Sequence, residues 1–123
     1  MIATGIRKVM VVDDDALTRI HFEQMLAEYG FDVAQAANGI EAISFYRNFQ
    51  PDMVFVNITM PDKCGLVILK EIKVADPQAQ VAMIVGEGQQ ALAMEALKTG
   101  AVDFVTKPFD QEEVLGTIKK ALG

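Results

Sequence analysis

The stretch PDMVFVNITMPDKCG, residues 51–65, holds a short apolar run that stops at a polar residue. Residues 53–56 are apolar throughout, as strands covered on both faces of a sheet usually are. Asn57 follows them directly, and the chain then turns through Met60-Pro61 towards Gly65. The stretch therefore predicts a buried strand that presents an amide side chain at its exposed end.

Further runs of this kind alternate with stretches of helical period along the chain. The other predicted strands span residues 8–12, 31–36, 81–85 and 101–106. Between them, apolar residues recur at the i, i+3, i+4, i+7 spacing of amphipathic helices; clear stripes are Phe22-Met25-Leu26-Tyr29 and Ala42-Phe45-Tyr46-Phe49. This alternation is typical of α/β proteins, and it predicts a parallel sheet with right-handed crossovers and helices on both faces.

Polar residues and glycines mark the expected helix ends. Gly30 and Gly100 stand where helix C-caps belong. Asp110, with Glu113 three residues on, has the pattern of an N-terminal capping box. Asp15 is expected to cap the helix that follows it.

Length and composition limit the classes of protein to consider. The 123 residues suit one core, so we expect a single domain over residues 1–123. Charged residues interrupt every apolar window before the roughly 20 residues that a membrane span needs, and the start resembles no secretory signal. One cysteine, Cys64, cannot form an internal disulfide, which suits a reducing compartment. We therefore expect a soluble, cytoplasmic protein that does not bind membranes.

The charge balance argues against nucleic acid as a partner. The net charge is -6, the isoelectric point is near 4.6, and the 11 Lys and Arg residues are scattered. A nucleic-acid binder needs its basic residues clustered on one face. We therefore expect this chain not to bind nucleic acid.

The carboxyl ends of the predicted strands hold the candidate site. In doubly wound sheets, ligands collect beyond these ends, where the strand order reverses. The residues that fall there are Asp13-Asp14-Asp15, Asn57, Val85-Gly86 and Thr106-Lys107-Pro108. The sequence thus predicts an acidic pair, an amide and a lysine at one edge of the sheet, with a cis peptide before Pro108.

Five stretches together resemble the receiver domain of two-component response regulators over nearly the whole chain. They are VMVVDDDALTR, NGIEAI, PDMVFVNITMPDKCG, GQQALAMEALKTGAVDF and TKPF. The resemblance implies a flavodoxin-like, doubly wound, five-stranded parallel sheet of order 2-1-3-4-5. Among members of that family, the sequence most resembles the stand-alone receivers of chemotaxis systems. It also implies a signalling protein as partner, either a histidine kinase or a downstream target, and leaves the oligomeric state open.

In that family, Asp13 and Asp14 would hold Mg²⁺ together with the acceptor carboxylate and the backbone carbonyl of Thr59. The acceptor is an Asp that attacks phosphorus and becomes an aspartyl phosphate. Here that position is Asn57, and an amide is a poor nucleophile, so we expect the usual reaction to fail. Losing one of three carboxylates also weakens the attraction for Mg²⁺. Asp13 and Asp14 still repel each other by several kcal/mol if about 4 Å apart, so they need Lys107 as a cation.

The switch positions of the family fall on three residues of this chain. Val85 stands where the family has a Ser or Thr whose hydroxyl follows the phosphoryl group. Valine keeps the shape of threonine but not its hydrogen bond, so the swap is not conservative. Phe104 matches the aromatic switch residue, and Lys107 matches the phosphate-binding lysine.

These departures indicate a pseudo-receiver that is no enzyme in its own right and acts by binding another protein. The alternative is an ordinary, phosphorylatable regulator that carries an introduced Asp-to-Asn change at Asn57. Blocking phosphorylation needs only one substitution, so the second departure at Val85 favours natural loss.

Two other classes fit the residues less well. A small haloacid-dehalogenase-like phosphatase would use Asp13 and Asp15 as its D-x-D pair, but that motif wants Thr or Val where Leu17 stands. A flavodoxin-like cofactor binder needs a phosphate loop after the first strand, and three aspartates there would repel a phosphate. We therefore expect no organic cofactor.

Overall fold

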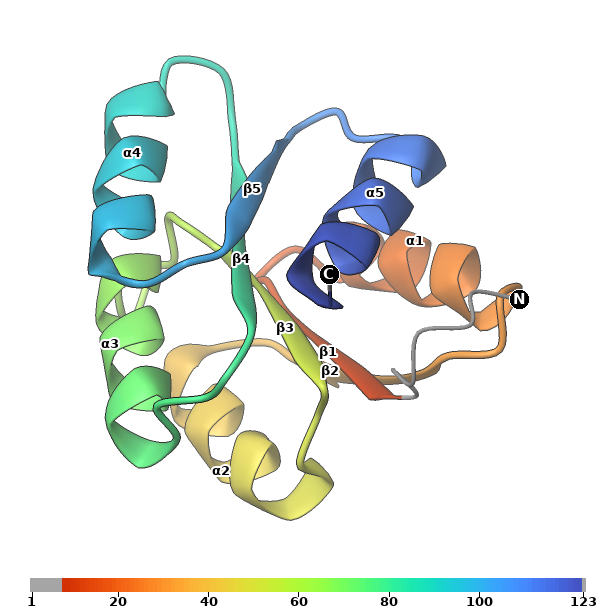
Figure 1. Cartoon of the computed structure of the whole chain (residues 1–123), viewed down its shortest axis with the longest axis horizontal. Coiled ribbons are helices and arrows are strands. Elements are labelled where there is room, and N and C mark those ends of the chain that lie inside the picture. The colour runs from red at the N-terminus through yellow and green to blue at the C-terminus, as the bar shows by residue number, and fades with distance from the viewer. Residues whose placement is uncertain (1–7, 123) are drawn as a thin grey trace.

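The computed structural model describes residues 8–122, in which five strands alternate with five helices (Figure 1). The strands are β1 (Lys8–Val12), β2 (Asp32–Ala36), β3 (Met53–Asn57), β4 (Val81–Val85) and β5 (Asp103–Thr106). The helices are α1 (Ala16–Ala27), α2 (Gly39–Phe49), α3 (Gly65–Ala75), α4 (Gln90–Thr99) and α5 (Gln111–Leu122). Among the described residues, no helix is long and apolar enough to cross a membrane.

The strands form one parallel sheet in the order β2-β1-β3-β4-β5. β1 lies between β2 and β3, so that Val12 pairs with both Ala36 and Val56. The predicted doubly wound, flavodoxin-like sheet is confirmed. Strand ends differ slightly from the sequence-based ranges, because β3 includes Asn57 while β2 and β5 start one and two residues later.

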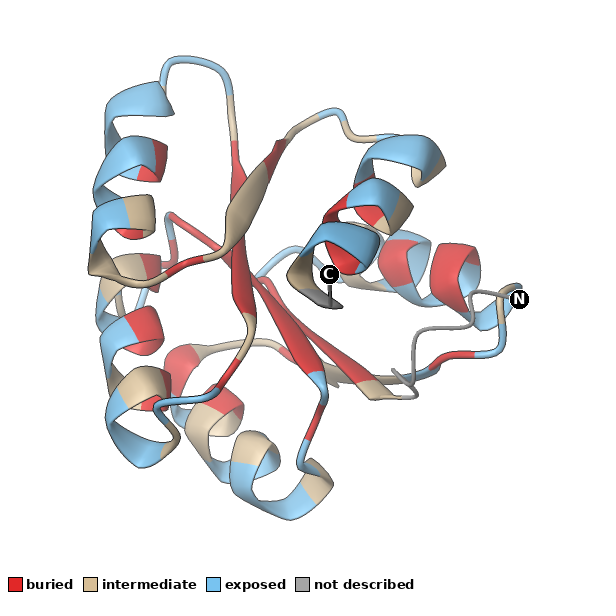
Figure 2. Ribbon diagram, in the orientation of Figure 1, coloured by how far each residue is buried: buried red, intermediate tan, exposed pale blue. Residues whose placement is uncertain are grey.

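Two layers of helices cover the sheet. Figure 1 shows α2, α3 and α4 on one face and α1 and α5 on the other. Alternate residues of each strand supply the two cores: Met10 and Val54 pack under the first layer, and Val11 and Phe55 under the second. Every residue of β3 and β4 is buried, because both are inner strands of the sheet with helices on both faces (Figure 2).

The buried stripe of α2 differs from the predicted one. Ala42 is buried and Tyr46 packs against the core, as expected, but Phe45 is 36% exposed and Ile43 packs against the core instead. The sequence offers apolar residues at all these positions, so periodicity alone cannot choose between two rotations of the helix. The Tyr46 hydroxyl donates a 2.8 Å hydrogen bond to Asp76 at the end of α3, so this residue connects the two helices.

The helix ends largely follow the sequence signals. Gly100 is the C-cap of α4, and the Asp15 side chain caps α1. Gly30 lies two residues beyond the C-cap of α1, Glu28, and has a positive φ of 85°. At α5 only half of the capping box forms.

At that helix, the Asp110 side chain accepts a 2.8 Å hydrogen bond from the backbone N–H of Glu113. The Glu113 carboxylate, in turn, accepts from the backbone N–H of Thr106 rather than from Asp110. The second hydrogen bond ties the start of α5 to the end of β5, where the candidate site lies.

Gly65 allows the loop after β3 to fold back closely on the end of the strand. A Cβ atom at residue 65 would overlap the Asn57 carbonyl oxygen and lie 2.7 Å from the Cα of Ile58. The Gly65 N–H donates a 2.9 Å hydrogen bond to the Ile58 carbonyl. This close approach holds the backbone at Asn57 in place.

Candidate functional site

The carboxyl ends of β1, β3 and β5 bring the predicted polar residues together. Asp13 is fully buried directly after β1, and Asn57 is 8% exposed at the end of β3. Asp14 is exposed beside them, and Lys107 reaches in from the residue after β5. The candidate site of the sequence analysis is thus one contiguous cluster in the structure.

The Asn57 amide lies at the centre of this cluster. Its Nδ2 atom donates to Asp13 Oδ1 and Asp14 Oδ1, each at 3.3 Å. The same nitrogen donates to the backbone carbonyl of Thr59 at 2.9 Å. One amide group therefore connects the three oxygen atoms that the sequence analysis assigned to a metal ion.

Asp13 has a second set of partners. Its Oδ1 atom also accepts a 2.9 Å hydrogen bond from the backbone N–H of Asp15, and its Oδ2 atom lies 3.1 Å from Nζ of Lys107. Burial raises the pKa of the Asp13 carboxyl above its ordinary value, while the Asp15 N–H and the Lys107 ammonium oppose that rise. Lys107 thus pairs with Asp13, one of the two carboxylates of the acidic pair.

Lys107 is positioned by the sheet and by the turn after it. Its backbone N–H donates a 2.7 Å hydrogen bond to the Val85 carbonyl, which extends the pairing of β4 with β5. The peptide bond between Lys107 and Pro108 is cis, as predicted.

The three acidic residues after β1 have separate roles. Asp15 does not join the cluster; its Oδ2 atom accepts a 2.6 Å hydrogen bond from the Thr18 hydroxyl, and its Oδ1 atom caps α1. The Thr18 hydroxyl is the main reason that the pKa of the exposed Asp15 carboxyl is lowered. A phosphatase that used Asp13 and Asp15 as a pair would need both carboxylates in one site, and here Asp15 is engaged as a cap.

The two other positions to which the resemblance assigns a switch lie in β4 and β5. Val85 is fully buried at the end of β4, and Phe104 of β5 is partly buried against the same core, beneath α3 and α4. Val85 has no hydroxyl, so it offers no hydrogen bond to a group placed at the strand ends.

Two residues that the sequence analysis did not single out support the site. Gln89 accepts a 2.6 Å hydrogen bond from the Gly86 N–H and donates one of 2.6 Å to the Thr59 hydroxyl, so it connects the loops after β4 and β3. Arg19 of α1 donates a 2.6 Å hydrogen bond to the Asp13 carbonyl. Nothing in the sequence distinguishes Gln89 from Gln90 beside it. Arg19 could have been found from the sequence, because it lies one helical turn after Asp15, the predicted N-cap of α1.

The oxygen atoms at the site are of the kind that Mg²⁺ prefers, namely two carboxylates and a backbone carbonyl. Asn57, however, directs its N–H groups at all three of them. Within residues 8–122, no group of three or more His, Cys, Asp or Glu side chains is arranged to hold a metal ion. A cation fits this donor set only if the Asn57 amide turns so that its oxygen replaces its nitrogen.

A doubly wound sheet with an acidic pair, a polar residue after the third strand and a Lys-Pro after the fifth defines a class of signalling domain. Residues 9–119 match the family model described as the response regulator receiver domain. The chain belongs to this family. Receiver domains interact with signalling partners such as kinases and downstream targets.

Particular relatives support this assignment over nearly their full length. The chain is 41% identical to the chemotaxis protein CheY of Bacillus subtilis over 116 residues, which cover 94% of this chain and 97% of the relative. It is 39% identical to the chemotaxis protein CheY of Thermotoga maritima, over 93% of this chain and 96% of the relative. The crystal structure of a response regulator receiver domain protein from Clostridium thermocellum superposes with a TM-score of 0.90 at 27% identity, covering 95% and 94% of the two chains.

Proposed function

We propose that this chain is a receiver-type module whose usual aspartyl phosphorylation is blocked at Asn57, and that it signals by binding another protein. The similarity to chemotaxis proteins favours a chemotaxis pathway, with a histidine kinase or a downstream target as partner. The module acts in the cytoplasm, is not an enzyme and needs no organic cofactor.

The chemistry of residue 57 supports the block. In phosphoryl transfer to a receiver, a carboxylate oxygen attacks phosphorus and the bond to the donor's leaving oxygen breaks. Asn57 occupies the expected place of that carboxylate, at the end of β3 beside Asp13 and Lys107. The lone pairs of an amide oxygen are delocalised into the C–N bond, and an attack through it leaves no stable acyl phosphate. The residue is therefore in position without being a nucleophile.

One observation carries the proposal furthest: the Asn57 amide donates to Asp13, Asp14 and the Thr59 carbonyl. A hydrogen bond to a charged group contributes about 1.5–3 kcal/mol. The amide thus stabilises the two carboxylates without a metal ion. Asp13, Asp14 and the Thr59 carbonyl would hold Mg²⁺, whose charge would stabilise a phosphoryl group, only after these hydrogen bonds were lost, so we propose weak binding.

A second feature supports a module that does not respond to phosphate. Val85 is fully buried and apolar at the position where the family has a hydroxyl. Restoring an acceptor at residue 57 would therefore attach phosphate without giving its oxygens a partner at β4. The alternative, an ordinary regulator with an introduced Asp-to-Asn change, accounts for Asn57 but not for Val85. The sequence of the native gene at codon 57 distinguishes the two.

The experiment is the intact mass of the purified chain after incubation with acetyl phosphate and MgCl₂, beside Asn57→Asp treated in the same way. We expect the mass of one phosphoryl group on the variant and none on the chain itself. A stable phosphoryl adduct on the chain at residue 57, with no deamidation there, contradicts the proposal.

A further inference from the structure

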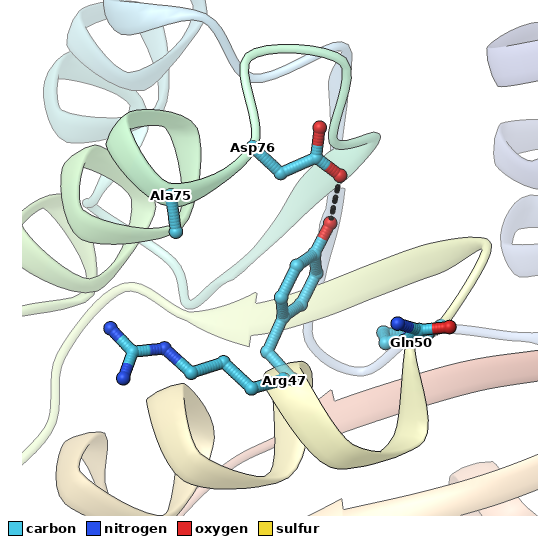
Figure 3. Close-up of a pocket in the computed structure, with 6 residues that line it drawn as sticks. Arg47, Gln50, Ala75 and Asp76 are labelled. Atoms are coloured by element: carbon cyan, nitrogen blue, oxygen red, sulfur yellow. Dashed lines mark hydrogen bonds between the residues drawn. The ribbon is translucent and has the colours of Figure 1, made fainter.

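A groove follows the seam between α2 and α3, and its lining does not include Asp13, Asn57 or Lys107 of the polar cluster. At the C-terminal ends of the two helices it opens into a hollow of about 640 Å³, lined by Tyr46, Arg47 and Asp76 among others (Figure 3). Two further hollows of about 360 and 400 Å³ continue along the helices. Arg47 lines all three hollows, so they adjoin one another around this residue, and we refer to them together as the groove.

Apolar side chains along this groove are left in water. Ile40 is 75% exposed, Val67 is 44% exposed and Val74 is 83% exposed. Each of them lines, or lies at the edge of, one of the two hollows between the helices. Exposed apolar residues gathered in one patch with a polar rim mark interaction sites, whereas single ones are ordinary.

The rim of the groove carries positive charge. Arg47, Lys63 and Lys70 line it, with Glu71 as the one carboxylate of the two hollows between the helices. Lys63 and Glu71 form a 2.9 Å ion pair. Within residues 8–122, Arg47 and Lys70 form no ion pair with another side chain. On a chain of net charge -6, this patch has the opposite sign and attracts acidic groups.

The groove is also held open in advance of binding. The Tyr46 hydroxyl on α2 donates a 2.8 Å hydrogen bond to Asp76, which is labelled in Figure 3, and this bond fixes the C-terminal ends of the helices relative to each other. Burial and the Asp76 carboxylate together raise the pKa of the Tyr46 phenol above its ordinary value, so the phenol remains a hydrogen-bond donor. A preformed groove loses less conformational entropy when a partner docks.

We propose that the groove between α2 and α3 binds an amphipathic helix of a partner protein, with an apolar stripe flanked by Asp and Glu. Both helices of the groove have 11 residues, which corresponds to about 16 Å or three turns of a docked helix. Side chains of a third helix fit the furrow between two packed helices, and its acidic residues meet Arg47 and Lys70. Residue 57 is not among the residues that line this surface.

The test uses a fluorescent synthetic helix of about three turns, with leucines at i, i+3, i+4 and i+7 and glutamates beside them. Binding to the chain is followed by fluorescence anisotropy and mapped by amide chemical shifts. We expect shifts on α2 and α3, and a loss of about tenfold or more in affinity for Arg47→Glu with Lys70→Glu, because attraction becomes repulsion. The matched control, Lys98→Glu with Lys119→Glu, changes the net charge equally on α4 and α5 and should keep full affinity.

A second pair of variants, one in the groove and one control, tests the apolar part of the groove. Ile40 on α2 and Leu17 on α1 are both 75% exposed. Ile40→Ser should weaken binding of the helix, and Leu17→Ser should not. Three results would overturn the proposal: no binding of the acidic helix, equal binding by the groove and control variants, or a self-associated chain that Ile40→Ser converts to monomer in sedimentation. The last result would assign the groove to a second copy of the chain.

Discussion

Replacing the amide at the centre of the site by a carboxylate, Asn57→Asp, should make the folded chain depend on a cation. The variant removes three N–H contacts and places a negative oxygen about 3.3 Å from Asp13 and from Asp14. Each such pair repels by about 5 kcal/mol at an effective dielectric near 20, and Lys107 offsets only part of this. After relaxation of the exposed Asp14, we expect a loss of about 2–4 kcal/mol in the free energy of unfolding without metal.

The assay is urea unfolding of the chain and of Asn57→Asp, each in EDTA and in saturating MgCl₂. Mg²⁺ at about 100 times its dissociation constant adds about 2.7 kcal/mol, so it should restore most of the stability of the variant and change that of the chain little. Asn48→Asp, which adds the same charge on the exposed side of α2, is the control and should not respond to Mg²⁺. If the chain and Asn57→Asp gain equally from Mg²⁺, the account of the amide as a replacement for the cation is wrong.

Three other predictions follow from the site. Gly65→Ala should lose about 2 kcal/mol or more in urea unfolding, because its Cβ meets the backbone at Asn57, while Gly116→Ala, open on all sides, should be neutral or stabilising. Gln89→Ala should speed amide hydrogen exchange at the loop after β4 and cost about 1–2 kcal/mol locally, since two hydrogen bonds are lost. Asn57→Asp alone should accept phosphate but barely shift α4; adding Val85→Thr should shift the switch equilibrium by roughly ten- to a hundredfold, measured as partner affinity.

Each of the three has an outcome that contradicts it. If Gly65→Ala and Gly116→Ala changed the free energy of unfolding equally, the loop after β3 would not be tightly packed. Unchanged hydrogen exchange in Gln89→Ala would show that the loops after β3 and β4 are not coupled. A full switch in Asn57→Asp without the second change would make Val85 a tolerated substitution and favour the engineered alternative.

The sequence was sufficient for the sheet and for the membership of the site. Strands such as 81–85 are apolar throughout, and buried parallel strands must place their carboxyl ends at one edge, so Asp13, Asn57 and Lys107 had to meet there. The rotation of α2 was not predictable in the same way. Ile43 and Phe45 are both apolar, so the periodicity does not distinguish them, and the structure shows that Ile43 packs against the core.

The orientation of single side chains also needed the structure. Sequence placed an amide at residue 57, but not which of its two ends faces the carboxylates. That depends on Asp13, Asp14 and the Thr59 carbonyl, which are all acceptors and so select the nitrogen. Gln89 was missed because its role depends on two loops that lie far apart in the chain, at Gly86 and Thr59.

The central claim is that the module does not change state when a phosphoryl donor is present. The direct measurement is the amide chemical shifts of residues 86–109, recorded for the chain with MgCl₂ before and after addition of acetyl phosphate. We predict that these shifts stay the same in the chain and move in Asn57→Asp with Val85→Thr under identical conditions. Shifts across α4 and around Phe104 in the unmodified chain, of the size seen in that double variant, would contradict the account.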